Sequence, residues 1–476
     1  MDPRRESGQR PASHWGLEPA IEFGPDVAPH PVLLPPLSGS TRSRMFFWHD
    51  VLRFLPREEL TVDTVFARVA GLDVHQKFIT VGVRCQLETG KLFAEVRTFG
   101  TMTRDLLALA AYLEELGITH VAMESTGVLW KPVWNILDGR FNLLLVNPRH
   151  IKQVPGRKSD VKDAEWIAQL LQCGLLRGSF VPPRELRELR DLTRLRAQLA
   201  GEQNRLANRI HKVLEDANIK LGAVASDILG KSGRAMLREL IRGEQDPNKL
   251  AELALGRLRG KIPDLRLALE GHFTAHHRFM VEHLLGHLDE LERHVEELSS
   301  RIEECLRPIL PDERVKQLDA IAGVDRTTIE NVVAEIGVDM SQFSDEHHIS
   351  SWAGICPGTE CSGGKRLRSR TTRKNRWLRR SLVEAAWAAS RTKNSYLGAR
   401  YRRLAPRRGK KKALVAVGHT LLVIFYHMLK HPDLEYKDLG ADYFDRLEPE
   451  RLQRYLVKRL ERLGFRVTLT PEAPAA

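Results

Sequence analysis

Residues 64–100, TVFARVAGLDVHQKFITVGVRCQLETGKLFAEVRTFG, contain three short runs rich in β-branched and aromatic residues, separated by turn residues. This pattern predicts three consecutive strands that form a meander. The segments that follow predict a helix at 105–116, a strand at 119–125 (THVAMES), a helix at 128–137, a strand at 141–147 (FNLLLVN) and a helix at 159–172. The order β-β-β-α-β-α-β-α predicts an α/β domain over residues 64–180, with a mixed sheet covered by helices.

Four acidic residues stand out by their positions in these elements. Asp73 lies in the apolar run GLDVH, and Glu124 lies at the end of a second strand in VAMES. Asp160 and Asp163, in KSDVKDAEWIA, are three residues apart, so they share one face near the start of a helix. An apolar strand does not normally bury a carboxylate without a partner. We therefore predict that the four carboxylates converge on paired divalent cations, and oxygen ligands favour Mg²⁺ or Mn²⁺.

Each acid alone has an ordinary explanation as a helix cap or a surface residue, so the prediction rests on their combination. The order of strands and helices supports it, because the same order is found in a ribonuclease H-like fold. His75 and Lys77 lie beside Asp73. They either tune the proposed metal site or simply face solvent.

Residues 181–310 predict long helices with coiled-coil seams. Leu192, Leu199, Leu206 and Val213 recur every seven residues, and Leu195 fills an intermediate core position. A second seam, with alternating steps of four and three, runs over Leu284, Leu288, Leu291, Val295, Leu298, Ile302 and Cys305. This spacing fits both a hairpin within one chain and a dimer interface. The insert at 218–275 predicts mainly helical structure.

Residues 311–476 predict a mainly helical C-terminal domain. Within it, residues 315–338 predict a helix, a short glycine turn and a second helix, which resembles a helix-hairpin-helix. The turn at Gly323 would present backbone N–H groups to a phosphate without base specificity. A plain helical corner fits the same pattern. An amphipathic helix at 449–463 and a final strand at 465–469 (FRVTL) are also expected.

The positive charge is concentrated in one block, which we call the basic block. Between Pro357 and Lys412 there are 19 Lys or Arg residues and two acids, a local net charge of +17, whereas the whole chain has +13. Such density favours a phosphate backbone, because each contact releases a condensed counterion. Apolar residues at helical spacing within the block favour a folded nucleic-acid-binding element over a solvated tract. The residues expected to contact nucleic acid are Lys365, Arg366, Arg368, Arg370, Arg373, Lys374 and Arg376.

Ser362 is the second candidate for chemistry. It lies in PGTECSGGKRLRSR, where two glycines leave the hydroxyl accessible and basic residues follow at once. A serine that attacks DNA stores the energy of the broken bond in its own phosphodiester, so rejoining needs no nucleotide cofactor. Serine is a weak nucleophile unless a base or a metal ion takes its proton, so the acidic residues or another base would have to lie nearby. A simple loop is the alternative.

Length and composition limit the class of protein. The 476 residues suffice for two or three domains, and a hydrophobic content of 42% argues against wholesale disorder. Five cysteines exclude a disulfide scaffold, and Cys356 and Cys361 lack the second pair that a structural zinc site needs. Residues 1–63 predict a flexible extension without a secretory signal. The apolar segment 413–430 contains Gly and His, so it predicts a buried helix rather than a membrane span. We expect a cytoplasmic protein with a polyanionic partner.

Several motifs, taken in order, resemble the DEDD transposases of bacterial insertion sequences, the IS110 group. They are GLDVH, MESTG, NPRHIKQVPGRKSDVKDAEWIAQLLQCGLL, LDAIAGVDRTTIENVVAEIG, SWAGICPG with SGGKR, and LRRSLVEAAWAA. The resemblance runs from about residue 67 to 470. It implies a RuvC-like domain, whose metal-binding tetrad falls on Asp73, Glu124, Asp160 and Asp163, and a C-terminal transposase domain whose catalytic serine falls on Ser362. Cys356, Cys361 and the N-terminal extension depart from the family pattern.

The resemblance also implies a recombinase that excises and inserts its element through a circular intermediate. Such a protein is guided by a structured bridge RNA and acts at the bacterial nucleoid as a dimer or tetramer, in which the two domains of different subunits meet. Two other interpretations stay open. A structure-selective nuclease would use metal-activated water, with Ser362 only a loop residue, and a third possibility is a nucleic-acid-binding protein without catalysis.

Overall fold

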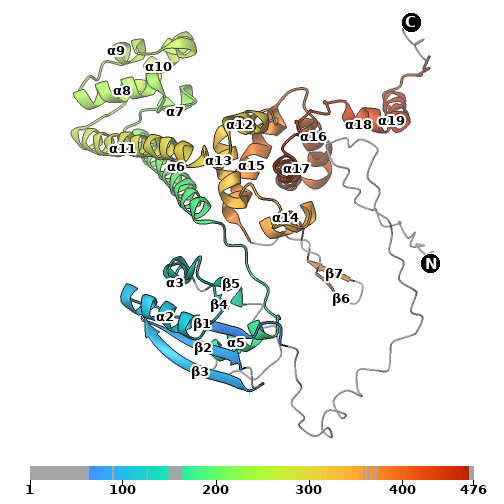
Figure 1. The fold of residues 1–476 in the computed structure, drawn as a ribbon. Coiled ribbons are helices and arrows are strands. Elements are labelled where there is room, and N and C mark those ends of the chain that lie inside the picture. Colours follow the sequence, from blue (N-terminus) through green and yellow to red (C-terminus); the bar gives the residue numbers. More distant parts are fainter. Residues whose placement is uncertain are drawn as a thin grey trace, which may run out of the picture. The chain divides into compact units, whose positions relative to one another are not determined.

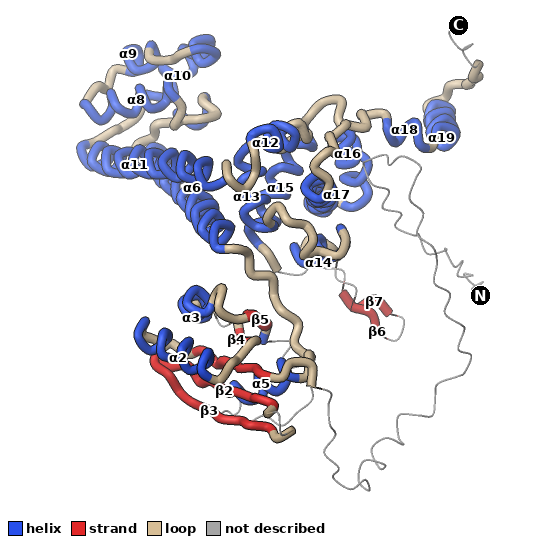
Figure 2. Tube along the Cα trace, viewed as in Figure 1, coloured by secondary structure: helices blue, strands red, loops and turns tan. Residues whose placement is uncertain are grey.

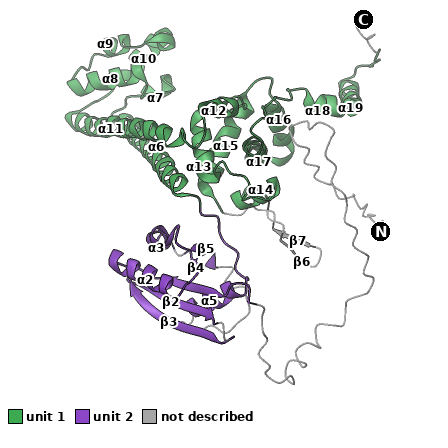
Figure 3. Cartoon of the chain, viewed as in Figure 1, with its two compact units in different colours: residues 1–25, 182–476 green, residues 26–181 purple. Residues whose placement is uncertain are grey.

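The computed structural model describes residues 64–87, 90–125, 127–148, 163–357, 360–362, 365–368, 371 and 374–470. These residues form two compact units, one ending at residue 181 and the other beginning at 182 (Figure 3). Three groups of predicted features lie outside the described residues: the N-terminal extension 1–63, Asp160, and the basic residues Arg370 and Arg373.

Within its described residues, the first unit is a five-stranded mixed sheet covered by helices α2, α3 and α5 (Figures 1 and 2). Its elements are β1 Arg68–Val74, β2 Phe78–Gln86, β3 Leu92–Gly100, α2 Thr103–Glu115, β4 His120–Glu124, α3 Trp130–Leu137, β5 Asn142–Val146 and α5 Asp163–Gln172. The strand order is β3-β2-β1-β4-β5, in which β1, β2 and β3 are antiparallel and β4 and β5 run parallel to β1. The predicted meander and the alternation after it are confirmed.

The two faces of this sheet contribute to different cores. Because side chains alternate along a strand, Leu72 and Met123 point to the face that α2 and α3 cover. Val69 and Ala122 point to the opposite face, which α5 covers. Both faces are therefore buried, and this explains why β1 and β4 are nearly continuous apolar runs.

The second unit begins with two long helices and the insert between them. These are α6 Arg184–Asp216, α7 Leu221–Val224, α8 Lys231–Arg242, α9 Pro247–Glu252, the 3₁₀ helix η2 Gly256–Lys261, α10 Ile262–Leu269 and α11 Ala275–Leu306. Helices α6 and α11 pack against each other along the chain's own hairpin, and the insert forms a core with their connected ends. The two predicted seams therefore belong to a hairpin within one chain, which was one of the two alternatives.

The predicted register of the first seam is wrong at Leu195. This side chain is 43% exposed, whereas Arg196 is buried at the next position. The inward face of α6 is instead lined by residues that include Leu189, Arg196 and Ile210. A strict seven-residue repeat assumes one partner along the whole helix, but the first half of α6 also packs against α13, in the C-terminal core.

The C-terminal core contains α12 Asp312–Asp319, α13 Arg326–Ile336, α14 Glu346–Ala353, α15 Arg376–Arg391, α16 Tyr396–Arg408 and α17 Lys410–Lys430. Among the described helices, α17 alone is long and apolar enough to cross a membrane. It packs against α14, α15 and α16, and its side chains include the buried Leu421 and Phe425, as expected for a core helix.

Two short helices follow, α18 Tyr443–Leu447 and α19 Pro449–Arg462, and the second corresponds to the predicted amphipathic helix. The predicted final strand is wrong, because residues 465–470 are described and form no strand. The domain also contains a hairpin that we did not predict, β6 Glu360–Ser362 and β7 Lys365–Arg368. Its sequence signal is the Gly-Gly pair between two short runs, which is typical of a two-residue hairpin loop.

Candidate active site

Asp73 and Glu124 lie at the same edge of the sheet. In the parallel pairing of β1 with β4, Leu72 lies opposite Met123, so each acid is the next residue along its strand. Alternation places both on the face of Val69 and Ala122, which α5 covers. Two carboxylates from neighbouring parallel strands therefore meet at the carboxyl ends of those strands, where ligands of open α/β sheets bind.

A pair of glycines lets α5 approach this face closely. Gly71 on β1 lies directly opposite Gly82 on β2. A Cβ atom at Gly71 would lie 2.3 Å from the carbonyl oxygen of Ala164, and one at Gly82 would lie 2.7 Å from the backbone nitrogen of Glu165. The first turn of α5 therefore rests on bare strand backbone. Asp163, the first residue of this helix, is thereby held over the face that carries Asp73.

The described acids have the following partners. Asp73 has a side chain that is 21% exposed, and its Oδ2 lies 3.0 Å from Nε2 of His75. The His75 ring lies 4.6 Å from the ring of Phe78. Glu165 Oε1 lies 4.0 Å from Nη1 of Arg84. His75 thus touches a candidate ligand directly.

The three described acids share one edge and one face, but they do not form a closed ligand set. Within the described part of the chain, no group of three or more His, Cys, Asp or Glu side chains is arranged to hold a metal ion. The fourth acid, Asp160, lies outside that part. The donor chemistry itself, carboxylate oxygens at one edge, suits Mg²⁺ or Mn²⁺.

Ser362 is the last residue of β6. It pairs across the hairpin with Lys365, and Gly363 and Gly364 are the residues between them in the sequence. A further antiparallel bridge between Pro357 and Thr371 lies beyond the other end of the strands. We call residues 357–371 the serine arm. Ser362 therefore lies at the closing pair of the hairpin loop, where Lys365 is the nearest cross-strand residue.

The described basic residues that follow the arm are exposed. Lys374 and Arg376 are solvent-accessible, and the guanidinium carbon of Arg376 lies 4.7 Å from the ring centre of Trp377. The backbones of Lys365, Arg366 and Arg368 belong to the hairpin.

Helix α15 continues this surface with a feature that we did not predict. Its exposed positions include Arg376, Arg380, Glu384, Trp387 and Arg391, at helical spacing. Trp387 is 53% exposed, and the guanidinium carbon of Arg391 lies 4.9 Å from its ring centre. An exposed tryptophan beside an arginine is a surface on which an unpaired base can stack. The apolar spacing of this helix includes Trp387 and does not distinguish a buried from an exposed position, so only the observed helix face shows the exposure of its ring.

The glycine turn between α12 and α13 has a packing role. Gly323 has a φ of +81°, and a Cβ atom there would lie 2.3 Å from the backbone nitrogen of Ala389 on α15. The N–H of Val324 donates to the carbonyl of Ile321. These contacts agree with the helical-corner alternative, and phosphate binding at Gly323 stays a prediction.

A zinc site near Ser362 gains no support. Cys356 is half-buried, and burial raises the pKa of its thiol, although nearby Lys374 acts in the opposite direction. A raised pKa disfavours the thiolate that zinc binds. The side chain of Cys361 lies outside the described set.

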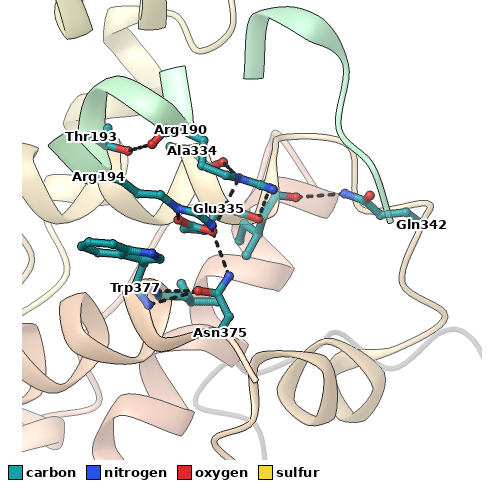
Figure 4. A network of polar contacts seen from close by, with 10 residues as sticks. Arg190, Thr193, Arg194, Ala334, Glu335, Gln342, Asn375 and Trp377 are labelled. Atoms are coloured by element: carbon teal, nitrogen blue, oxygen red, sulfur yellow. Dashed lines mark hydrogen bonds and ion pairs between the residues drawn. The ribbon is translucent and has the colours of Figure 1, made fainter. Parts of the chain in front are cut away.

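A network of buried polar contacts joins α6, α13 and the start of α15 (Figure 4). Its centre is Glu335 on α13, which contacts Arg190 and Arg194 of α6 and Asn375 at the start of α15. On the same helix, Glu330 binds Arg196 at 2.6 Å and Arg326 at 3.2 Å. Neither pair was predicted, because apolar periodicity does not reveal buried carboxylates.

Comparison with known protein families gives two matches. Residues 70–219 match a family model described as a transposase, and residues 315–402 match the model of the transposase IS116/IS110/IS902 family. Together the two matches cover half of the 476 residues. None of the curated proteins matches the chain.

Two solved structures are similar to part of the chain. The Thermus thermophilus RuvC structure is 15% identical, with 24% of this chain and 99% of that chain covered and a TM-score of 0.19. T. thermophilus RuvC in complex with a Holliday junction substrate is 14% identical, with the same coverage and a TM-score of 0.18.

Proposed function

Because the chain belongs to the IS116/IS110/IS902 transposase family, we propose that it cleaves and rejoins DNA with a metal-binding acid tetrad and a serine nucleophile. The first unit would be a RuvC-like domain of the ribonuclease H fold, whose strand order agrees with that found here. Asp73, Glu124, Asp160 and Asp163 would hold Mg²⁺ or Mn²⁺. The observation that supports this proposal is that Asp73 and Glu124 end neighbouring parallel strands on one face of the sheet, and that Asp163 begins the helix that covers this face.

The chemistry divides between the two units. Bound divalent ions would neutralise charge on the reacting phosphate. The hydroxyl oxygen of Ser362 forms a bond to phosphorus while the bond from phosphorus to the strand oxygen breaks. The serine proton passes to a base, for which the carboxylates of the acid tetrad are the candidates, and the departing oxygen takes up a proton. Rejoining reverses these steps, so no nucleotide is consumed.

The partners follow from the charge. The basic block would bind the phosphates of the element ends and of the target DNA, and Trp387 offers a stacking surface for an unpaired base. The family resemblance adds a bridge RNA and a dimeric or tetrameric assembly, in which acid tetrad and serine come from different subunits. Such a protein would act in the cytoplasm, at the nucleoid.

Covalent capture tests the nucleophile. The wild-type protein, incubated with Mg²⁺ and element-end DNA, should form an adduct that survives denaturation and maps to Ser362 by mass spectrometry. Ser362→Ala should form none, whereas Ser300→Ala, which changes an exposed serine on α11, should form it normally. Cleavage without an adduct would instead support the structure-selective nuclease, because hydrolysis by water leaves no protein–DNA bond.

A further inference from the structure

The serine arm is connected to the helical core through two short segments. On the entry side, Ile355 is buried in the C-terminal core, two residues before Pro357. On the exit side, Asn375 follows Thr371 by four residues and precedes α15 directly. The Pro357–Thr371 bridge holds the two segments together. Ile355 and Asn375 are therefore points at which the chain on either side of the bridge is tied to the helical core.

Asn375 makes two kinds of hydrogen bond at once. Its Oδ1 accepts from the backbone nitrogens of Trp377 and Leu378, both at 3.1 Å, and this caps the first turn of α15. Its Nδ2 donates to Oε2 of Glu335 at 2.8 Å. The cap alone would fix the residue relative to α15. The second bond fixes it relative to α13 as well.

Glu335 connects this point to α6. Its carboxylate is 3% exposed and accepts two hydrogen bonds from Arg194, at 2.7 Å from Nε and 2.8 Å from Nη2. Arg190 Nε lies 3.5 Å from Oε2, and its Nη2 donates to the backbone oxygen of Glu335. A bidentate arginine pair restricts the carboxylate in both distance and angle. One buried carboxylate thus joins α6, α13 and the exit of the serine arm (Figure 4).

We propose that Glu335 is a positioning residue for strand transfer: it fixes the exit of the serine arm relative to α6 and α13. This proposal rests on the proposed function, because it assigns the arm its serine nucleophile. Displacing a nucleophile by about 1 Å costs up to roughly 100-fold in rate. An anchor of this kind therefore affects catalysis without touching DNA.

Glu330 provides a matched control. It lies on the same helix, its side chain is 5% exposed, and it also pairs with an arginine of α6, but it pairs with Arg196 and Arg326 and not with Asn375. Glu330→Gln should therefore destabilise the core about as much as Glu335→Gln. It should leave the serine arm in place.

The experiment measures three quantities in the full-length protein: thermal unfolding, DNA affinity, and the rate of covalent capture at saturating DNA. We expect Glu335→Gln to slow capture by at least about tenfold, with affinity within about twofold of the wild type. Glu330→Gln should keep the wild-type rate. Asn375→Ser keeps a capping oxygen but loses the donor to Glu335, and it should slow capture as Glu335→Gln does.

The double variant gives the sharpest outcome. If both residues act through one hydrogen bond, Glu335→Gln with Asn375→Ser should be no slower than the slower single variant. Hydrogen exchange of the β6 and β7 amides, measured without DNA, should quicken in both single variants but not in Glu330→Gln. Equal loss of rate in Glu335→Gln and Glu330→Gln, or unchanged exchange in the arm, would overturn the proposal. A wild-type protein that forms no adduct would instead contradict the proposed function.

Discussion

Asp73 is the residue on which the proposed metal site most depends, because it lies on the central strand of the sheet between the antiparallel and parallel halves. Replacing its carboxylate with an amide keeps the shape but removes the charge that a divalent cation needs. Asp73→Asn should reduce strand cleavage by at least about 100-fold, while DNA binding by gel shift stays within about twofold of the wild type.

Glu165→Gln is the control for that variant. Glu165 lies in the first turn of α5 beside Asp163, but it is not a member of the tetrad and lies near Arg84. Its loss should leave cleavage close to normal. Full recombination by Asp73→Asn in Mg²⁺ would remove the basis for the metal site.

Gly71 allows a test of how α5 is seated. An added methyl group would lie 2.3 Å from the Ala164 oxygen and 2.4 Å from the Ala168 nitrogen, both backbone atoms that cannot rotate away. Gly71→Ala should therefore lower the free energy of unfolding by about 1–3 kcal/mol. Gly286→Ala, in α11, meets nothing within 4 Å, and should raise stability by about 0.5–1 kcal/mol. Urea denaturation measures both, and a neutral Gly71→Ala would mean that α5 lies farther from the sheet.

At this scale the sequence predicts some site residues and misses others for a physical reason. Asp73 and Glu124 are predicted because a carboxylate in an apolar strand is anomalous, and Asp163 because it shares a helix face with Asp160; their role as metal ligands stays a prediction. Gly71 and Gly82 are not predicted, because their importance depends on the β1–β2 register, which pairs residues 11 positions apart. Long-range pairing of this kind has no local signal.

Among the helices, α6 shows what sequence periodicity can and cannot predict. The seams correctly indicated that α6 and α11 are long and pack on apolar faces. The register failed at Leu195 because α6 has different partners along its length. Arg190, Arg194 and Arg196 face buried carboxylates of α13, and only the later part packs with the helical insert.

This difference can be measured with two leucines of the same helix. Leu206 is 3% exposed in the core shared with the insert, whereas Leu195 is 43% exposed. Leu206→Ala should cost about 2–5 kcal/mol of unfolding free energy, and Leu195→Ala should change it by less than about 0.5 kcal/mol. Equal losses in thermal or chemical denaturation would restore the heptad register that the sequence suggested.

Helix α17 should make stability depend on pH through His419. Burial, reinforced by Arg400 and His347, lowers the pKa of His419 from 6.5 to about 4. The negative charge of Glu346 acts to raise the pKa of His419, but the other effects outweigh it. The unfolded chain therefore binds this proton near pH 6.5 and the folded chain only near pH 4. The contribution of neutral, buried His419 to the free energy of unfolding is therefore complete above pH 6.5 and is lost as the pH falls toward 4. His419→Gln should flatten this part of the stability curve, and an unchanged slope would assign the acid sensitivity to other groups.

For the whole molecule, the dominant feature is the uneven distribution of charge. The basic block carries +17, so the remainder of the chain sums to −4. Because the net positive charge of the chain comes from this block, nucleic acid should be drawn to the serine arm and α15 rather than spread over the surface. The sequence alone predicts this preference, since it depends on composition. Which basic side chains can contact phosphate depends on the helix face on which each one lies, and the structure shows that face.

The dependence of binding on salt therefore identifies the cations that meet phosphate. Replacing Lys374, Arg376 and Arg391 with glutamine removes three exposed charges of the block. If each meets one phosphate of duplex DNA, the slope of log K against log salt should become shallower by about 0.9 per residue. The control replaces Arg293 and Arg301 of α11 and Arg307 at its C-cap, three exposed arginines that pair with nearby glutamates. The net charge changes equally in both triple variants, so equal slopes would show that overall charge, and not the basic block, determines the affinity.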